Sequence, residues 1–294
     1  MPAPPTRAFA AQLASSLVLA LAWLIARLPL SWLQGAGAYA GRLALRASPE
    51  FRRKTREHLA IAQLPVDELA CASAAQVGVA AAETPWIWFS GDDRLRPRLR
   101  IEGFEWLERA QAHGRGVILL TPHLGSFEAA ARAVALSCPI TVLYKPPRDA
   151  LGHQLILAGR QRPHLHLAPA SAAGVRTLVR ALRRGEAIGV LPDQVPSEGE
   201  GRWVPFFNRP AYTMILPERL AALTGALVLM GHAERLPRGQ GWIVRIEPLE
   251  AGPAPLEVNR AMETIIRRMP AQYFWGYNRY KAPPGVSHPA GTDA

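Results

Sequence analysis

The residues best suited to chemistry lie in the stretch Val-Ile-Leu-Leu-Thr-Pro-His-Leu-Gly-Ser-Phe-Glu, residues 117–128. Its apolar start predicts a buried strand over 117–121, and a turn that carries His123 follows before an apolar helix begins. A histidine at a strand end with a carboxylate five residues later is a candidate catalytic pair. On one regular helix the two side chains would lie about 140° apart, because each residue turns about 100°. We therefore expect His123 in the turn and Glu128 in the first helical turn.

In this arrangement Glu128 would point back and accept a hydrogen bond from one imidazole nitrogen, and the helix N-terminus would help to keep it ionised. The other nitrogen of His123 could then take a proton from a hydroxyl. The alternative is that His123 merely ends a strand and Glu128 is a solvated acid, since such pairs often arise by chance. Ser126 is interpreted as a helix N-cap and not as a nucleophile, because the G-x-S-x-G motif is absent.

The balance of charges indicates a negatively charged partner. The 294 residues are 49% hydrophobic, as in a globular protein, but 34 Lys+Arg against 23 Asp+Glu give a formal net charge of +11. Nucleic acid, anionic lipid, a phosphorylated substrate and an acidic carrier protein all qualify. Because the basic residues are scattered and no recognised nucleic-acid-binding module is present, nucleic acid is not expected. Cys71 and Cys138 lie far apart, so neither a disulfide framework nor a thiolate metal site is predicted.

The N-terminal region favours a membrane anchor. Residues 8–26 carry no charge and approach the length that spans a bilayer. A cleaved signal peptide is the alternative, but no small-x-small cleavage site follows cleanly, and the chain continues with more apolar character. Arg7 alone precedes the segment, whereas several basic residues follow it up to residue 56, so the positive-inside rule places the body of the chain in the cytoplasm. The expected units are an anchor over 1–35 and a helical membrane-proximal segment over 36–98.

The rest of the chain predicts an α/β domain over 99–282, followed by a disordered tail over 283–294. Apolar runs alternate with helical patterns, which favours a sheet that is at least partly parallel and flanked by helices. Because active residues gather beyond the carboxyl ends of such strands, His123 and Asp193-Gln194 are expected at one edge. The expected strands are 117–121, 140–144, 187–191, 226–231 and 242–247, and the expected helices are 126–137, 149–160, 171–184, 211–224 and 256–268.

Several common catalytic motifs are absent. The sequence has no G-x-x-x-x-G-K-[ST], no G-x-G-x-x-G and no H-E-x-x-H. Hydrolysis of nucleoside triphosphates, dinucleotide redox chemistry and zinc-dependent proteolysis therefore have no support. Five further histidines, at 113, 153, 164, 166 and 232, lack a matched partner in the sequence and are expected at the surface or satisfied in the core. No metal site is predicted.

Four further stretches carry a resemblance to a known family. They are Val-Leu-Tyr-Lys-Pro at 142–146, Arg160, the run 192–207 with Asp193-Gln194 and Val-Pro-Phe-Phe, and the aromatic-basic segment 272–281. In this order, after a hydrophobic N-terminus, the chain resembles the late acyltransferases of lipid A biosynthesis, the lauroyl/myristoyl-type membrane enzymes, up to about residue 281. The H-x-x-x-x-[DE] pair of that family is met by His123 and Glu128. Its fold is a membrane-anchored α/β domain related to glycerolipid acyltransferases.

This resemblance implies transfer of a fatty acyl chain from acyl carrier protein to a hydroxyl of an acylated, phosphorylated glucosamine disaccharide at the bacterial inner membrane. His123 would be the general base, assisted by Glu128. Arg160 is a candidate oxyanion donor or phosphate clamp, because a guanidinium donates several hydrogen bonds at once. Lys145 could attract phosphate or the acidic carrier, and Asp193 with Gln194 would form a loop of the cleft. No cofactor is implied beyond the acylated carrier as co-substrate.

Two other functions compete with this interpretation. One is an acyltransferase of the same family that acts on another membrane lipid, such as an ornithine lipid or a glycolipid. The other is a basic membrane-binding protein without catalysis. Substitution of His123 separates catalysis from binding, because it should remove acyl transfer and leave binding to anionic lipid unchanged.

Overall fold

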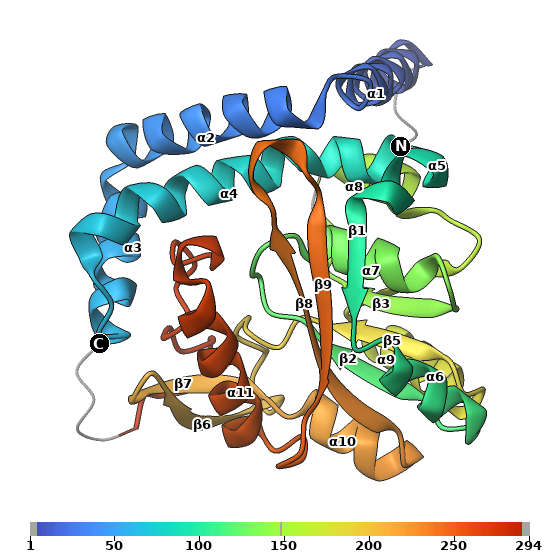
Figure 1. The fold of residues 1–294 in the computed structure, drawn as a ribbon, viewed down its shortest axis with the longest axis vertical. Coiled ribbons are helices and arrows are strands. Elements are labelled where there is room, and N and C mark those ends of the chain that lie inside the picture. Colours follow the sequence, from blue (N-terminus) through green and yellow to red (C-terminus); the bar gives the residue numbers. More distant parts are fainter. Residues whose placement is uncertain (1–4, 148, 290–294) are drawn as a thin grey trace.

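Helices form the first third of the chain, and an α/β layer follows (Figure 1). The computed structural model describes residues 5–147 and 149–289; residues 1–4 of the expected anchor and 290–294 of the expected tail lie outside them. From residue 15 onward, no single helix of the described chain is long and apolar enough to cross a membrane, although Ser15–Ile25 and Leu30–Ala47 pass that test as a pair bent by 113°. The spanning anchor thus stays a prediction. The first helices are α1 (Pro5–Ile25), α2 (Leu30–Ala47), α3 (Pro49–Ile61), α4 (Val66–Phe89) and α5 (Asp92–Leu95).

A mixed seven-stranded sheet forms the centre of the molecule, which confirms the predicted α/β fold. Its order is β1-β9-β8-β2-β5-β3-β4, and every pair is parallel except β8 with β9. The strands are β1 (Leu99–Glu102), β2 (Val117–Leu120), β3 (Ile140–Tyr144), β4 (Leu165–Pro169), β5 (Ala187–Val190), β8 (Leu227–Arg235) and β9 (Trp242–Pro248). The flanking helices are α6 (Glu105–Ala112), α7 (Phe127–Ala135), α8 (Ala150–Arg160), α9 (Ala172–Arg183), α10 (Leu216–Thr224) and α11 (Pro255–Arg268).

The predicted helix over 211–224 is partly wrong. A two-stranded antiparallel hairpin, β6 (Gly201–Phe206) and β7 (Arg209–Met214), occupies its first residues, and α10 begins only at Leu216. The aromatic and β-branched side chains of Tyr212 and Thr213 suit a strand, and Pro217 suits the first turn of a helix. The short strands β1 and β4 were not predicted, because neither is a continuous apolar run.

Helix α2 packs on α4 with the two backbones in direct contact. A Cβ atom added to Gly41 would lie 2.0 Å from the carbonyl oxygen of Ala74, and one added to Gly78 would lie 2.0 Å from that of Gly37. Only glycine allows this approach, so three glycines hold α2 against the body of the protein. The same side of α2 also buries Leu33.

We expect Gly41→Ala to destabilise the fold by about 1–3 kcal/mol, because the added methyl group overlaps the backbone of α4. Gly35→Ala is the matched control in the same helix, since a Cβ atom there has no heavy atom within 4 Å. It should be neutral or stabilising by up to about 1 kcal/mol. Urea unfolding of the two variants measures both effects, and equal midpoints would contradict the close packing of the two helices.

His232, in β8, is buried without a hydrogen-bond partner for either ring nitrogen among the described residues. It is thus a core histidine, but the expectation that it is satisfied was wrong. Burial lowers the pKa of His232 to about 4. Since an unfolded histidine has a pKa near 6.5, the unfolded chain binds a proton there that the folded chain does not, and stability is lost as the pH falls from about 6.5 to about 4.

We expect His232→Leu to remove this part of the pH dependence. The free energy of unfolding of the wild type should fall between pH 6.5 and pH 4 by about 3 kcal/mol more than that of the variant, since each pKa unit corresponds to about 1.4 kcal/mol. Chemical unfolding at both pH values measures the difference, and His113→Leu, at an exposed position, is the control. Parallel pH curves for wild type and His232→Leu would rule out the buried neutral imidazole.

Candidate active site

The turn that carries His123 is fixed by backbone hydrogen bonds to three neighbours. Thr121 N donates to Val190 O at the end of β5, Gly125 N donates to Gln272 O, and Ser126 N donates to Ala233 O in β8. Gly125 has φ +59°, and a Cβ atom there would lie 2.0 Å from Ala233 O, so the tight turn needs glycine at this position. The turn therefore holds His123 at the carboxyl end of β2, as predicted.

Asp193, which follows β5, holds the imidazole of His123. One carboxylate oxygen lies 2.8 Å from Nδ1 of the ring, and the other accepts the backbone N–H of His123 at 2.9 Å. Asp193 is 2% exposed. Burial acts to raise the pKa of the Asp193 carboxyl, but the charge of His123, these two hydrogen bonds and the charge of Arg279 together hold the pKa below its ordinary value. The carboxylate is thus ionised at neutral pH.

These contacts select one tautomer of His123. An ionised carboxylate can only accept, so Nδ1 of the neutral ring carries the proton and Nε2 has the free lone pair. The side-chain amide of Gln194 lies 3.2 Å from Nε2, a distance at which its N–H donates to that lone pair. Gln194 is exposed, and its amide covers the nitrogen that a substrate hydroxyl would approach. The ring is therefore arranged as a base, with Gln194 as a replaceable cap.

Glu128 lies in the first turn of α7, as expected, but it does not hydrogen-bond His123, and the predicted contact is wrong. Its carboxylate accepts the indole N–H of Trp88 at 2.7 Å and two N–H groups of Arg160, one of them from Nε at 3.1 Å. The sequence spacing predicted the right helical turn but could not show that Trp88 and Arg160 would donate to this carboxylate. Asp193 takes the orienting position that had been assigned to Glu128.

The Glu128 contact brings together three helices. Trp88 comes from α4, Glu128 from α7 and Arg160 from the end of α8, and the guanidinium also lies 5.7 Å from the Trp88 ring. Two of the guanidinium nitrogens bond Glu128, which leaves Nη1 of Arg160 with no partner among the described residues. Lys145, at the end of β3, is exposed and likewise has no partner in that part of the chain. Arg160 is thus held in place by Glu128, whereas no described residue holds the Lys145 side chain.

Ser126 was expected to cap α7 through its side chain and not to act as a nucleophile, and the structure does not show the side-chain cap. Ser126 occupies the N-cap position of α7, but its side chain accepts no capping hydrogen bond. It is buried, and its backbone N–H is already used by β8. The residue therefore ends the turn through its backbone, and its hydroxyl does not accept a hydrogen bond from the first N–H groups of α7.

The segment after α11 connects both loops of the site. Phe274 N donates to His123 O at 3.1 Å, and Val195 N donates to the hydroxyl of Tyr277 at 2.9 Å. Two aromatic residues of this segment, Tyr273 and Trp275, are buried at 4% and 1% exposure. The segment thus fixes the position of the His123 turn relative to the Asp193 loop.

A buried ion pair supports the same turn from behind. Arg235 donates to both carboxylate oxygens of Glu83 at 2.8 Å and to Gly125 O at 2.8 Å. Both side chains are at most 2% exposed, and Trp242 also donates to Glu83 at 3.3 Å. Loss of one partner would leave the other charge buried without a counter-charge, at a cost of about 3–5 kcal/mol. Helix α4 is thereby locked to the carboxyl side of the sheet.

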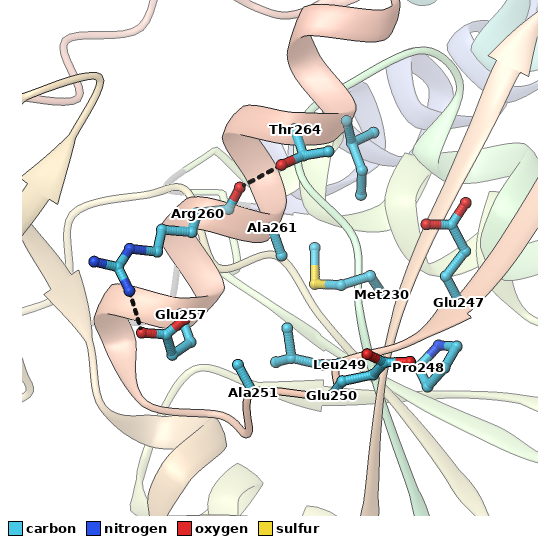
Figure 2. A pocket seen from close by; sticks show the side chains of 11 residues that line it. Met230, Glu247, Pro248, Leu249, Glu250, Ala251, Glu257, Arg260, Ala261 and Thr264 are labelled. Carbon is cyan, nitrogen blue, oxygen red and sulfur yellow. Dashed lines mark hydrogen bonds and ion pairs between the residues drawn. The ribbon is translucent and has the colours of Figure 1, made fainter.

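A cavity of about 550 Å³ opens elsewhere, between α11 and the strands β8 and β9 (Figure 2). Met230, Leu249 and Ile265 are among its apolar lining residues, and Glu247 and Glu257 are among its acidic ones. None of the candidate site residues lines it, so we do not assign it to the chemistry of His123.

Sequence reasoning identified His123, Asp193 and Gln194 but missed Trp88, Gln272 and Arg235. The sequence around Trp88 gives no sign that its indole N–H would bind a carboxylate. Gln272 opens the aromatic-basic segment, which is the one available hint of its position. Arg235 follows an apolar run. A buried arginine there needs an acidic partner, and the sequence alone does not show which acid that is.

An α/β sheet with a tautomer-fixed histidine beyond its central strands has the geometry that general-base catalysis requires. Comparison with known proteins gives the family. Residues 5–282 match the family described as bacterial lipid A biosynthesis acyltransferase, and the chain belongs to this family. It is an acyltransferase.

Curated relatives cover nearly the whole chain. The lipid A biosynthesis palmitoleoyltransferase of Escherichia coli (strain K12) is 30% identical over 279 residues, 90% of each chain. The lipid A biosynthesis acyltransferase of Shigella flexneri has the same identity and coverage. The lipid A biosynthesis lauroyltransferase of Escherichia coli (strain K12) is 26% identical over 276 residues, 89% of each chain. The resemblance stated from the motifs is thus confirmed at the level of the family.

We expect Asp193→Asn to lower kcat about 10³-fold or more, as for the loss of an orienting acid in other histidine enzymes. An amide offers one acceptor and one donor, so it cannot accept from both the backbone N–H and Nδ1–H of His123. If it accepts from the backbone, it donates to Nδ1 and places the ring proton on Nε2, which can then no longer act as base.

The ¹⁵N chemical shifts of His123 report the tautomer, and acyl-transfer kinetics report the rate. Glu250→Gln, at an exposed position, is the control for loss of one carboxylate. Glu128→Gln should leave the Nδ1–H tautomer in place, whatever its effect on rate. An unchanged tautomer and near-normal kcat in Asp193→Asn would show that Asp193 does not orient the base.

Proposed function

We propose that the protein transfers a fatty acyl chain from the thioester of acyl carrier protein to a hydroxyl of a lipid A precursor at the bacterial inner membrane, with His123 as general base. The observation that carries this proposal is the contact of the buried Asp193 carboxylate with Nδ1 of His123, which leaves Nε2 as the unprotonated ring nitrogen. The names of the relatives, all of lipid A biosynthesis, support the acceptor. The net charge of +11 suits both a phosphorylated acceptor and an acidic carrier.

The reaction has two steps. The acceptor hydroxyl displaces the Gln194 amide from Nε2 of His123 and attacks the thioester carbonyl while its proton moves to Nε2. A C–O bond forms, and the negative charge moves to the carbonyl oxygen. The tetrahedral intermediate then expels the carrier thiolate, which takes the proton from the imidazolium, so that ester and free thiol leave. Asp193 stabilises the imidazolium between the two steps without taking its proton.

Arg160 is proposed as the cation that meets the oxyanion or an acceptor phosphate. Its bidentate contact with Glu128 fixes the plane of the guanidinium and leaves Nη1 as a donor. Glu128 acts in this proposal through Arg160 and not through His123. The exposed Lys145 is proposed to attract the phosphorylated acceptor or the acidic carrier before the site is occupied.

We expect His123→Ala to lower acyl transfer by a factor of about 10² to 10⁴, the range for loss of a general base. Purified full-length protein would be given acyl-acyl carrier protein and a lipid A precursor, with mass spectrometry of the product as the readout. His113→Ala is the matched control, because His113 is exposed and its ring contacts only the backbone of its own helix.

Two results would contradict parts of the proposal. Wild-type turnover in His123→Ala would exclude this residue as the base. Transfer by the wild type to an ornithine lipid or another glycolipid, but not to the lipid A precursor, would leave the mechanism and replace the acceptor.

A further inference from the structure

Exposed apolar side chains concentrate at one place on the molecule. Among the described residues, nine of the thirteen large hydrophobic side chains that are exposed lie between Leu17 and Leu43, on α1, on α2 and at the bend between them. Scattered single apolar residues are normal on a protein surface, but a continuous group of this kind marks a binding surface. The first two helices therefore present an apolar surface that the rest of the protein does not cover.

On α2 these side chains form a stripe opposite the packed side. Trp32, Tyr39 and Leu43 are 69%, 70% and 52% exposed and are seven and four residues apart, which places them on one side of a helix. Gly37 and Gly41 face the other way, against α4. Helix α2 lies outside α4 in Figure 1. Because its inner side is closely packed, α2 cannot roll over to bury the stripe.

The charge around the stripe has one sign. The sequence has no Asp or Glu before Glu50, whereas Arg42 and Arg46 lie exposed on α2. At the bend, the guanidinium of Arg27 lies 4.0 Å from the ring of Trp23. Tryptophan and tyrosine favour the boundary between headgroups and acyl chains, and arginine binds lipid phosphates. An anionic bilayer offers both an apolar boundary and lipid phosphates at the depth where this surface would meet it.

We propose that the outer side of α2, defined by Trp32, Tyr39, Leu43, Arg42 and Arg46, is a membrane-docking face that lies in the plane of an anionic bilayer. The bend of 113° supports an in-plane position, because α2 does not continue the direction of α1. In this arrangement α2 adds an interfacial contact that a spanning segment at residues 8–26 would not provide. The apolar stripe enters the headgroup boundary, and the two arginines contact phosphates.

The docking face also sets the orientation of the active site relative to the bilayer, and this consequence rests on the proposed function. Helix α4 contacts α2 on one side and, through Trp88 and Glu83, the Glu128 and Arg235 contacts of the site on the other. Docking through α2 therefore turns the carboxyl edge of the sheet towards the bilayer. A lipid acceptor could then reach His123 without leaving the membrane surface.

The test places a polarity-sensitive fluorophore at one position of the full-length protein at a time. In a Cys71→Ser background, which leaves only the buried Cys138, the label is attached at Leu43→Cys or at the control Leu223→Cys. Leu43 and Leu223 are matched in residue type and are 52% and 58% exposed. With vesicles of phosphatidylethanolamine and phosphatidylglycerol, the emission of the label at position 43 should shift to the blue, and the emission at position 223 should not.

The charge of the face is tested separately. Arg42→Gln with Arg46→Gln should weaken binding to these vesicles about tenfold or more at low salt, since each basic residue near an anionic surface adds affinity. Arg176→Gln with Arg183→Gln, two exposed arginines of α9, is the matched control and should bind as the wild type does. Binding to vesicles of phosphatidylcholine alone should differ little among the variants.

Two outcomes would overturn the proposal. A label at position 43 that stays in an aqueous environment while the protein is bound to vesicles would show that α2 does not touch the bilayer. A blue shift that needs no lipid and grows with protein concentration would show that a second copy of the chain covers the face. Neither experiment uses an acyl donor, so failure of the proposed reaction would not be mistaken for failure of docking.

Discussion

The structure of the site depends on one carboxylate that accepts two hydrogen bonds from one residue. Asp193 receives both the backbone N–H and the ring Nδ1–H of His123, so it fixes the turn and the tautomer at once. A buried carboxylate would otherwise raise its pKa and take up a proton, and a protonated acid would lose this selectivity. The charge of Arg279 helps to prevent that. The tautomer of His123 is thus set by a residue seventy positions later in the chain, in the loop after the neighbouring strand β5.

The other buried charges serve the same turn. Arg235 with Glu83 braces Gly125, and Arg160 with Glu128 joins α7, α8 and α4. Such pairs add little stability compared with apolar packing, because both charges give up their hydration. They do specify geometry, since a guanidinium meets a carboxylate in a planar, two-point contact. The site is therefore surrounded by polar contacts that allow only one arrangement of the loops that carry His123 and Asp193.

Local sequence predicted what depends on local pattern. The apolar runs at 117–121, 140–144 and 187–191 became β2, β3 and β5, and the loops after the first and third placed His123 beside Asp193 because parallel strands end at one edge. The partner of His123 could not be predicted in this way. Glu128 and Asp193 were both available, and the choice was decided by Trp88 and Arg160, which reach Glu128 from distant helices. Short or half-exposed strands such as β4, and the hairpin that replaced the start of a predicted helix, lacked a clear period and were missed for that reason.

The position of α4 links chemistry to the surface. A helix that covers the carboxyl edge of a parallel sheet would normally close the place where substrates bind, yet here it supplies Trp88 and Glu83 to the contacts around the site. The glycines let α2 pack directly against the backbone of α4. Little protein therefore lies between the exposed stripe of α2 and α4. A bulkier residue at Gly78 would push α2 away and shift α4 against Glu128 and Arg235 as well. Surface geometry and the orientation of His123 therefore depend on the same helix, and a change that moves α4 cannot alter one without the other.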